Sequence, residues 1–135
     1  MNAALKQFPA RMNALGDVLI HVDTNCVQAG LTGDKRACVA LVIEELFSNT
    51  VTHGYQQDSD RPVWISAERD GNALRLIYQD EAPAFNPLTH PKDPLPDRVG
   101  GWGIPMIENF ADAAYRYENG RNTLTLNFKI SEPVE

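Results

Sequence analysis

The sequence is poor in cysteine, carries no excess of positive charge and contains no long hydrophobic run. Its two cysteines, Cys26 and Cys38, stand in apolar helical patterns without metal-ligand spacing or the density of a secreted disulfide scaffold, so we expect both to be reduced core residues. Asp and Glu outnumber Lys and Arg by 18 to 12. This balance argues against the basic surface that nucleic-acid-binding proteins use, and we expect no direct nucleic-acid partner.

Membrane and secretion signals are also absent. The longest apolar run, residues 37–43, is far too short to span a bilayer, and the first residues lack a charged start followed by an apolar core. We therefore expect a cytoplasmic protein with no membrane partner. With 43% hydrophobic residues in 135, the chain can bury a core without disulfides, and we expect residues 1–135 to form one domain whose core spans about 10–130.

The spacing of apolar residues predicts two helices in the first half of the chain. One helix covers residues 10–29 and stops at Gly30. The other covers residues 34–52, with Asp34 as a good N-cap and an end near Gly54.

Alternating hydrophobic residues predict strands in the second half. A hairpin covers residues 63–78, and two further strands cover 113–117 and 123–130, with a short helix over 104–110 before them. Residues 3–8 form an edge strand or a loop, and the pattern does not decide between them. Antiparallel hairpins with helices gathered on one face predict a two-layer α+β sandwich, with about three helices on one face of a mostly antiparallel, mixed sheet.

A polar stripe runs along the second predicted helix. Glu45, Asn49 and His53 follow one another at four-residue steps, with Thr52 beside them, so they share one face. Such a stripe is common on a solvated face, but apolar residues continue it toward the helix start, which favours a partly enclosed pocket. Asn49 could supply the single protein oxygen that a magnesium ion needs beside water and phosphate. Glu45, one turn away, could accept a proton from an attacking hydroxyl or water.

Asp80 stands where the second strand of the first hairpin ends. An aspartate in this position is often only a turn residue. Its functional alternative is a buried acceptor for an exocyclic amine such as that of adenine, and a site built around that hydrogen bond discriminates against bases that lack the amine.

A glycine cluster precedes the short helix predicted from Ile104. This cluster, Gly100, Gly101 and Gly103, is either a turn or a phosphate-binding loop. In the second case free backbone amides and the positive end of the helix dipole would stabilise the negative charge of the phosphate. Arg98 either is an ordinary surface residue or adds a charge-assisted contact to a terminal phosphate.

Together these motifs resemble a known family. The runs EELFSNTVTHGY (44–55), DEAPAFNP (80–87), RVGGWGIPMI (98–107) and GRNTLTL (120–126) are similar to those of the RsbW and SpoIIAB-like anti-sigma-factor serine kinases. Their ATP-binding fold, the Bergerat or GHKL fold, is shared with gyrase, histidine kinases and MutL. Motifs in the right order are far more specific than any one of them.

The resemblance implies roles for individual residues. It makes Glu45 the general base, Asn49 the magnesium ligand and Asp80 the adenine-binding aspartate, with Gly101 and Gly103 in a glycine-rich lid near the phosphates. It implies ATP binding also for His53, Ala82, Phe85, Arg98, Gly100, Ile104 and Thr123. Ala82 departs from the family, which has glycine there, so a methyl group lies where the backbone passes close to the base.

The resemblance further implies an activity and partner proteins. It predicts an ATP- and Mg²⁺-dependent serine/threonine protein kinase that phosphorylates an anti-sigma antagonist of the STAS type and sequesters a sigma factor, with a homodimer as its assembly. A nucleotide-binding partner-switch module without catalysis is the first alternative. A histidine-kinase catalytic domain used by another chain is the second, although no segment supplies a dimerisation hairpin with an acceptor histidine.

Overall fold

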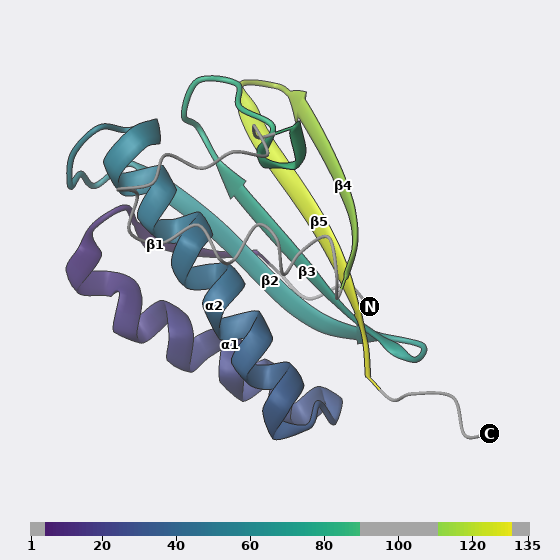
Figure 1. Ribbon diagram of the computed structural model, residues 1–135. Helices are drawn as coiled ribbons and strands as arrows, with labels where there is room; N and C mark the ends of the chain where they lie inside the picture. The colour runs from purple at the N-terminus through teal and green to yellow at the C-terminus, as the bar shows by residue number, and fades with distance from the viewer. Residues whose placement is uncertain (1–4, 90–110, 131–135) are drawn as a thin grey trace, which may run out of the picture.

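The computed structural model describes residues 5–89 and 111–130. Its strands form one sheet in the order β1-β2-β3-β5-β4 (Figure 1). The bounds are β1 (Lys6–Pro9), β2 (Pro62–Asp70), β3 (Ala73–Asp80), β4 (Ala111–Glu118) and β5 (Arg121–Lys129). Every neighbouring pair is antiparallel. Over the described residues the sheet is therefore antiparallel throughout, and the prediction of a mixed sheet is wrong.

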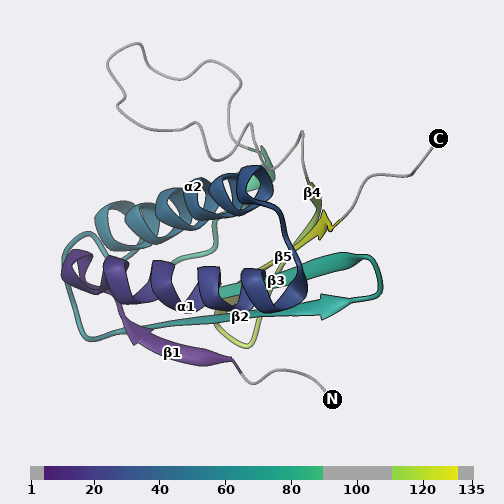
Figure 2. The same ribbon diagram turned by 90° about the horizontal axis from the view of Figure 1, so that it is seen from below.

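Two α-helices, α1 (Leu15–Ala29) and α2 (Gly33–Asn49), lie side by side on one face of this sheet, as Figures 1 and 2 show from two directions. A short 3₁₀ turn, Met12–Ala14, leads into α1. The predicted two-layer α+β sandwich is confirmed. The third predicted helix, residues 104–110, lies outside the described residues.

The helix ends follow local chemistry. Gly30 ends α1 with φ of 92°, a left-handed conformation that glycine adopts without strain, and its N–H bonds to the carbonyls of Cys26 and Val27. The prediction that Asp34 caps α2 is wrong, because Thr32 has the extended N-cap conformation and Asp34 lies in the first turn. There its negative charge still complements the positive end of the helix dipole.

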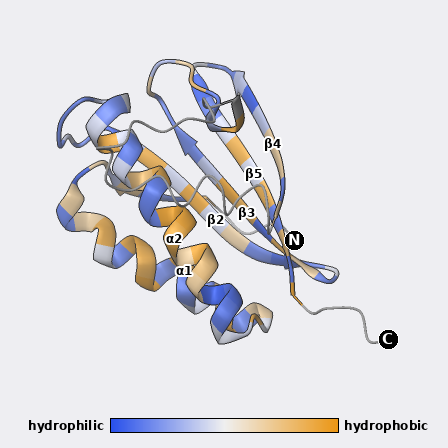
Figure 3. Cartoon of the chain, viewed as in Figure 1, coloured by the Kyte–Doolittle hydropathy of each residue, from blue (hydrophilic) through white to orange (hydrophobic). Residues whose placement is uncertain are grey.

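The core fills the space between the helices and the sheet. Inward-facing side chains alternate along β3 and β5 with outward-facing ones, and Figure 3 shows hydrophobic residues in both layers, on the helices and on the strands. The side chains that are almost completely buried come from both layers: Val18, Val22, Val39, Val42, Ile43, Phe47, Val63, Ile65, Leu74, Leu76 and Leu126. Because burial is continuous from α1 through α2 to β5, the end of α2 is held firmly above β3.

The question of an N-terminal edge strand is answered for residues 6–9. This segment forms β1, and Phe8 lies opposite Val63 of β2 and packs against the ring of His21. Both cysteines are free, and burial raises the pKa of the Cys26 thiol to about 12. Within residues 5–89 and 111–130, no helix is both long and apolar enough to cross a membrane.

Candidate nucleotide site

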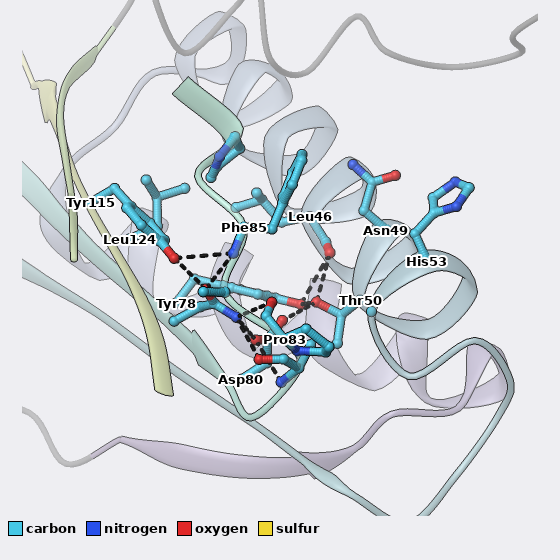
Figure 4. A pocket seen from close by; sticks show the side chains of 15 residues that line it. Leu46, Asn49, Thr50, His53, Tyr78, Asp80, Pro83, Phe85, Tyr115 and Leu124 are labelled. Carbon is cyan, nitrogen blue, oxygen red and sulfur yellow. Dashed lines mark hydrogen bonds between the residues drawn. The ribbon is translucent and has the colours of Figure 1, made fainter. Parts of the chain in front are cut away.

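A cavity of about 720 Å³ opens beside the end of α2. Its walls come from three parts of the chain: residues 46–54, residues 78–87 and residues 115–124. Figure 4 shows Thr50, Tyr78 and Asp80 converging at one end, with Asn49 and His53 on the helix at the other side. The volume falls in the usual range for small-molecule sites, about 300–1,000 Å³.

The helix wall changes its winding where the cavity begins. After Asn49 the chain continues as a π-helical turn, Thr50–Gly54, in which Tyr55 N–H bonds to Thr50 O at 2.7 Å. The hydroxyl oxygens of Thr50 and Tyr78 each lie 3.1 Å from the carbonyl oxygen of Leu46. The predicted α-helix to residue 52 is thus α-helical only to Asn49 and continues as the π-helical turn.

Asp80 is the buried polar centre of the site. Its side chain, at the end of β3, is only 7% exposed. One carboxylate oxygen accepts the Thr50 hydroxyl at 2.7 Å, and the other accepts the Asn122 amide at 2.9 Å and the Ala82 N–H at 3.2 Å. A carboxylate offers about four acceptor positions. These three donors therefore leave room for one more.

A chain of hydroxyls supports Asp80 from the helix side. The hydroxyls of Tyr78 and Thr50 lie 2.6 Å apart. Because a carboxylate oxygen only accepts, Thr50 donates to Asp80, and Tyr78 can donate to Thr50 in turn. Burial raises the pKa of the Tyr78 hydroxyl well above its ordinary value, so it remains a proton donor over the physiological range.

Ala82, the residue that replaces the family's glycine, fits against Gly54. A Cβ built on Gly54 would meet the Ala82 Cβ at 2.8 Å, closer than real Cβ atoms come. The methyl group of Ala82 is 3% exposed and lines the cavity. The absence of a side chain at position 54 thus provides the space that the extra methyl needs.

The predicted phosphate side is more open. Asn49 is half-buried, His53 is exposed, and both line the cavity. Glu45, one turn earlier on α2, is half-buried and is not among the described residues that line the cavity. Thr52 is exposed and donates its hydroxyl to Ser48 O at 2.8 Å, so it lies beside the stripe without joining the cavity wall.

The remaining predicted positions divide into three groups. Phe85 lines the cavity and is 53% exposed. Thr123 does not line the described cavity: it pairs with Gln79 in the sheet, on the face opposite to that of Asp80. The other five lie outside the described residues: Arg98, Gly100, Gly101, Gly103 and Ile104.

Sequence reasoning missed several residues that the structure places in the site. Asn122 lies directly opposite Asp80 in the sheet, and Thr50, Tyr78 and Tyr115 complete the polar wall. A signal for Asn122 was available, because it alternates with the apolar residues Leu124 and Leu126 on the inward face of β5.

Residues 8–128 match the family described as the histidine kinase-like ATPase domain. The chain belongs to this family. An anti-sigma F factor of Shouchella clausii (strain KSM-K16) is 31% identical over 96 residues, which cover 67% of this chain and 66% of that protein. An anti-sigma F factor of Priestia megaterium is 29% identical over 112 residues, which cover 78% of this chain and 76% of that protein. The resemblance to anti-sigma factors that the motifs predicted is confirmed.

A solved structure gives the same fold for this histidine kinase-like ATPase domain. The RsbU and RsbW domains of a Mycobacterium tuberculosis protein match with a TM-score of 0.62 at 24% identity. The match covers 97% of this chain and 34% of that one. At this identity the likeness shows the architecture, and the function has to be argued from the site.

Proposed function

We propose that the cavity binds ATP with Mg²⁺, with the purine at the Asp80 end and the phosphates toward Asn49 and His53. The observation that carries this proposal is the arrangement around Asp80, whose buried carboxylate is held by three donors and keeps about one acceptor position for an exocyclic amine. The apolar side chains of Leu46, Phe85 and Leu124 line the same cavity and suit the faces of a purine ring.

Asn49 suits a magnesium ion. Its half-buried side chain stands at the cavity with an amide oxygen and forms no side-chain hydrogen bond within residues 5–89 and 111–130. Among those residues no three His, Cys, Asp or Glu side chains gather as a protein-only metal site. Magnesium binds through one or two protein oxygens together with substrate phosphates, and when bound it would neutralise phosphate charge.

The second part of the proposal is phosphoryl transfer to a serine or threonine of another protein. Glu45 would accept the proton of the acceptor hydroxyl, and its place one helical turn from Asn49 puts it beyond the cavity wall, where an acceptor could approach. Arg98 and the glycines Gly100, Gly101 and Gly103, with Ile104, would surround the phosphates as the family resemblance implies. Such catalysis consists mostly of positioning and charge stabilisation.

The partners belong to the same proposal. The matched relatives from Shouchella clausii and Priestia megaterium are named as anti-sigma F factors. By analogy this chain would sequester a sigma factor in the cytoplasm, as a homodimer, and would be released from it through a STAS-type antagonist that it phosphorylates. The net charge of −6 agrees with a protein partner rather than a nucleic acid.

One observation favours a second candidate function. Because Glu45 is not among the described residues that line the cavity, the protein could bind the nucleotide to set its shape and sequester its partner without transferring phosphate. Both candidates require ATP binding, and they differ only in the transfer step.

Phosphoryl transfer separates the two candidates. The wild-type protein, Glu45→Gln and the matched control Glu44→Gln, whose exposed side chain is the neighbour of Glu45, are each incubated with Mg²⁺, γ-labelled ATP and a STAS-domain antagonist from the same genome. We expect label on serine or threonine with the wild type and the control, and a loss of about 100-fold or more with Glu45→Gln, as for removal of a catalytic base. Calorimetry should give the same ATP affinity for all three.

Other outcomes would change the conclusion. Equal ATP binding with no transfer by the wild type would support the module without catalysis. An absence of ATP binding by the wild type would refute both candidates.

A further inference from the structure

The side chain of Asn122 fastens the loop after β3 to the sheet. Its amide nitrogen donates to Asp80 Oδ1 at 2.9 Å, to the Ala82 carbonyl at 3.0 Å and to the Pro83 carbonyl at 3.2 Å. Its oxygen accepts the Phe85 N–H at 3.0 Å and the Tyr115 hydroxyl. One residue of β5 thus joins the base-reading carboxylate to three backbone groups of the loop.

These partners fix the orientation of the amide. The nitrogen faces three groups that only accept, and the oxygen faces an N–H and a hydroxyl, which donate. Turning the amide over would oppose acceptor to acceptor at the three carbonyl and carboxylate oxygens and donor to donor at the Phe85 N–H, and only the Tyr115 hydroxyl could adapt. The hydrogen bonds therefore determine which atom is nitrogen.

The amide is also fully used. Two N–H groups already serve three acceptors, and the oxygen already receives two donors, so Asn122 has no capacity left for a base. Its role in the site is therefore to position other groups and not to contact the ligand.

Asn122 acts beside other residues that hold the loop: Tyr55 and Arg61 bond to the backbone of Glu81, and the Tyr115 hydroxyl accepts the Phe85 N–H. Residues 81–86 belong to no helix or strand, so no backbone ladder holds them in place. Asn122, by contrast, lies in β5, between β3 and β4. The carboxylate of Asp80 is hydrogen-bonded on both oxygens, by Thr50 on one and by Asn122 on the other, which restricts rotation of the side chain.

We propose that Asn122 is a positioning residue that sets the preference of the site for purines with an exocyclic amine, by holding Asp80 and the 82–85 loop in the base-reading arrangement. This inference rests on the proposed binding of ATP. A nucleotide whose base carries the amine benefits from a fixed Asp80, whereas one with a keto group in the same position gains nothing from it.

The experiment compares ATP with ITP, which has a keto group in place of the amine. Dissociation constants of both Mg²⁺ complexes are measured by calorimetry for the wild type, Asn122→Asp, Asn122→Ala and the control Asn127→Asp. Asn127 is in the same strand but on the other face of the sheet, opposite Arg75 and Asp112. We expect the wild type and the control to prefer ATP by at least about 10-fold, the value of one good hydrogen bond in a closed site.

Asn122→Asp and Asn122→Ala should each reduce this preference to about 3-fold or less, mainly by lowering the affinity for ATP. Asn122→Asp sets a carboxylate against Asp80 and two carbonyls, and Asn122→Ala removes every contact without adding charge, so a folding failure of the first leaves the second as the test. Loss of folded protein alone lowers the apparent binding of ATP and ITP equally, so the ratio of their dissociation constants stays unchanged.

Hydrogen exchange without nucleotide gives a second readout. The Phe85 amide should exchange at least about 10-fold faster in either Asn122 variant than in the wild type, while amides of β2 and β3 keep their rates. If the wild type prefers ATP but both Asn122 variants keep that preference and the Phe85 exchange rate, the inference is wrong and the proposed function stands. If the wild type shows no preference for ATP, the inference and the adenine assignment both fail.

Discussion

The two ends of the cavity differ in how completely they are built. At the base end, Asp80, Thr50 and Tyr78 are buried and joined by hydrogen bonds of 2.6 and 2.7 Å. At the other end, Asn49 is half-buried and His53 exposed, and neither side chain forms a hydrogen bond within residues 5–89 and 111–130. On the proposed function, the end that recognises the base is held by hydrogen bonds before the nucleotide binds, and the end that contacts the phosphates is open.

This difference has a physical reason. A buried carboxylate is costly unless it is hydrogen-bonded, so a base-reading aspartate needs a complete set of donors before the ligand arrives. Side chains that bind a metal and phosphates can stay hydrated in the free protein. The incoming Mg²⁺ and phosphates then replace this water and become the partners of these side chains. Variants that disturb one end should therefore affect binding and stability differently from variants at the other.

The largest effect is expected from Asp80→Asn at the base end. An amide keeps only one acceptor oxygen. If this oxygen stays on the side of Asn122, N–H groups replace the oxygen on the side of Thr50, and the exocyclic amine loses its acceptor. Calorimetry should show Mg-ATP affinity reduced by about 100-fold, the upper end for a hydrogen bond to a charged group. Asp70→Asn, at the exposed end of β2, is the control, and an unchanged affinity in Asp80→Asn would contradict the adenine assignment.

A smaller effect, on stability, is expected from Gly54→Ala. The new methyl would lie 2.8 Å from the Ala82 Cβ, and overpacking of this kind costs about 2 kcal/mol of unfolding free energy. Thermal or denaturant unfolding measures the loss. The double variant with Ala82→Gly should recover most of it.

Gly16→Ala is the matched control, because nothing lies within 4 Å of its added Cβ and it stands inside α1. Alanine there should stabilise the protein by up to about 1 kcal/mol, the helix-propensity difference. Equal losses in Gly54→Ala with either residue at position 82 would show that the contact does not limit packing.

The smallest effect on the free energy of unfolding is expected at the open end, from Asn49→Ala. Since the amide has no side-chain partner in the described chain, the apo protein should keep its stability to within about 0.5 kcal/mol. Nucleotide binding should nevertheless lose its dependence on the metal, so titration of ATP with Mg²⁺ and with EDTA should give similar affinities. A metal dependence equal to that of the wild type would exclude Asn49 as the ligand.

The same contrast explains what the sequence could predict. Asn49, His53 and Asp80 were found because helix spacing and a strand end place them without knowledge of other segments. Thr50 and Tyr78 were not found, since their hydroxyls look like ordinary helix and strand residues until α2 packs on β3. The packing of distant segments is not contained in a local pattern.

The prediction for β5 shows how sensitive such reasoning is to register. Thr123 was selected by its place in the motif, yet its neighbour Asn122 is the residue opposite Asp80. A shift of one position in a strand moves a side chain to the other face of the sheet. The π-helical turn after Asn49 was also not predicted, because the apolar spacing of residues 34–52 fits an α-helix throughout.

The place of β5 in the sheet has a consequence for synthesis of the protein. This strand, residues 121–129, is the last of the described elements along the chain, yet it lies between β3 and β4. A nascent polypeptide on the ribosome that stops before residue 121 therefore has no strand to join β3 to β4 and lacks Asn122. On the proposed role of Asn122, the nucleotide site is complete only after translation has passed this point and the strand has left the exit tunnel.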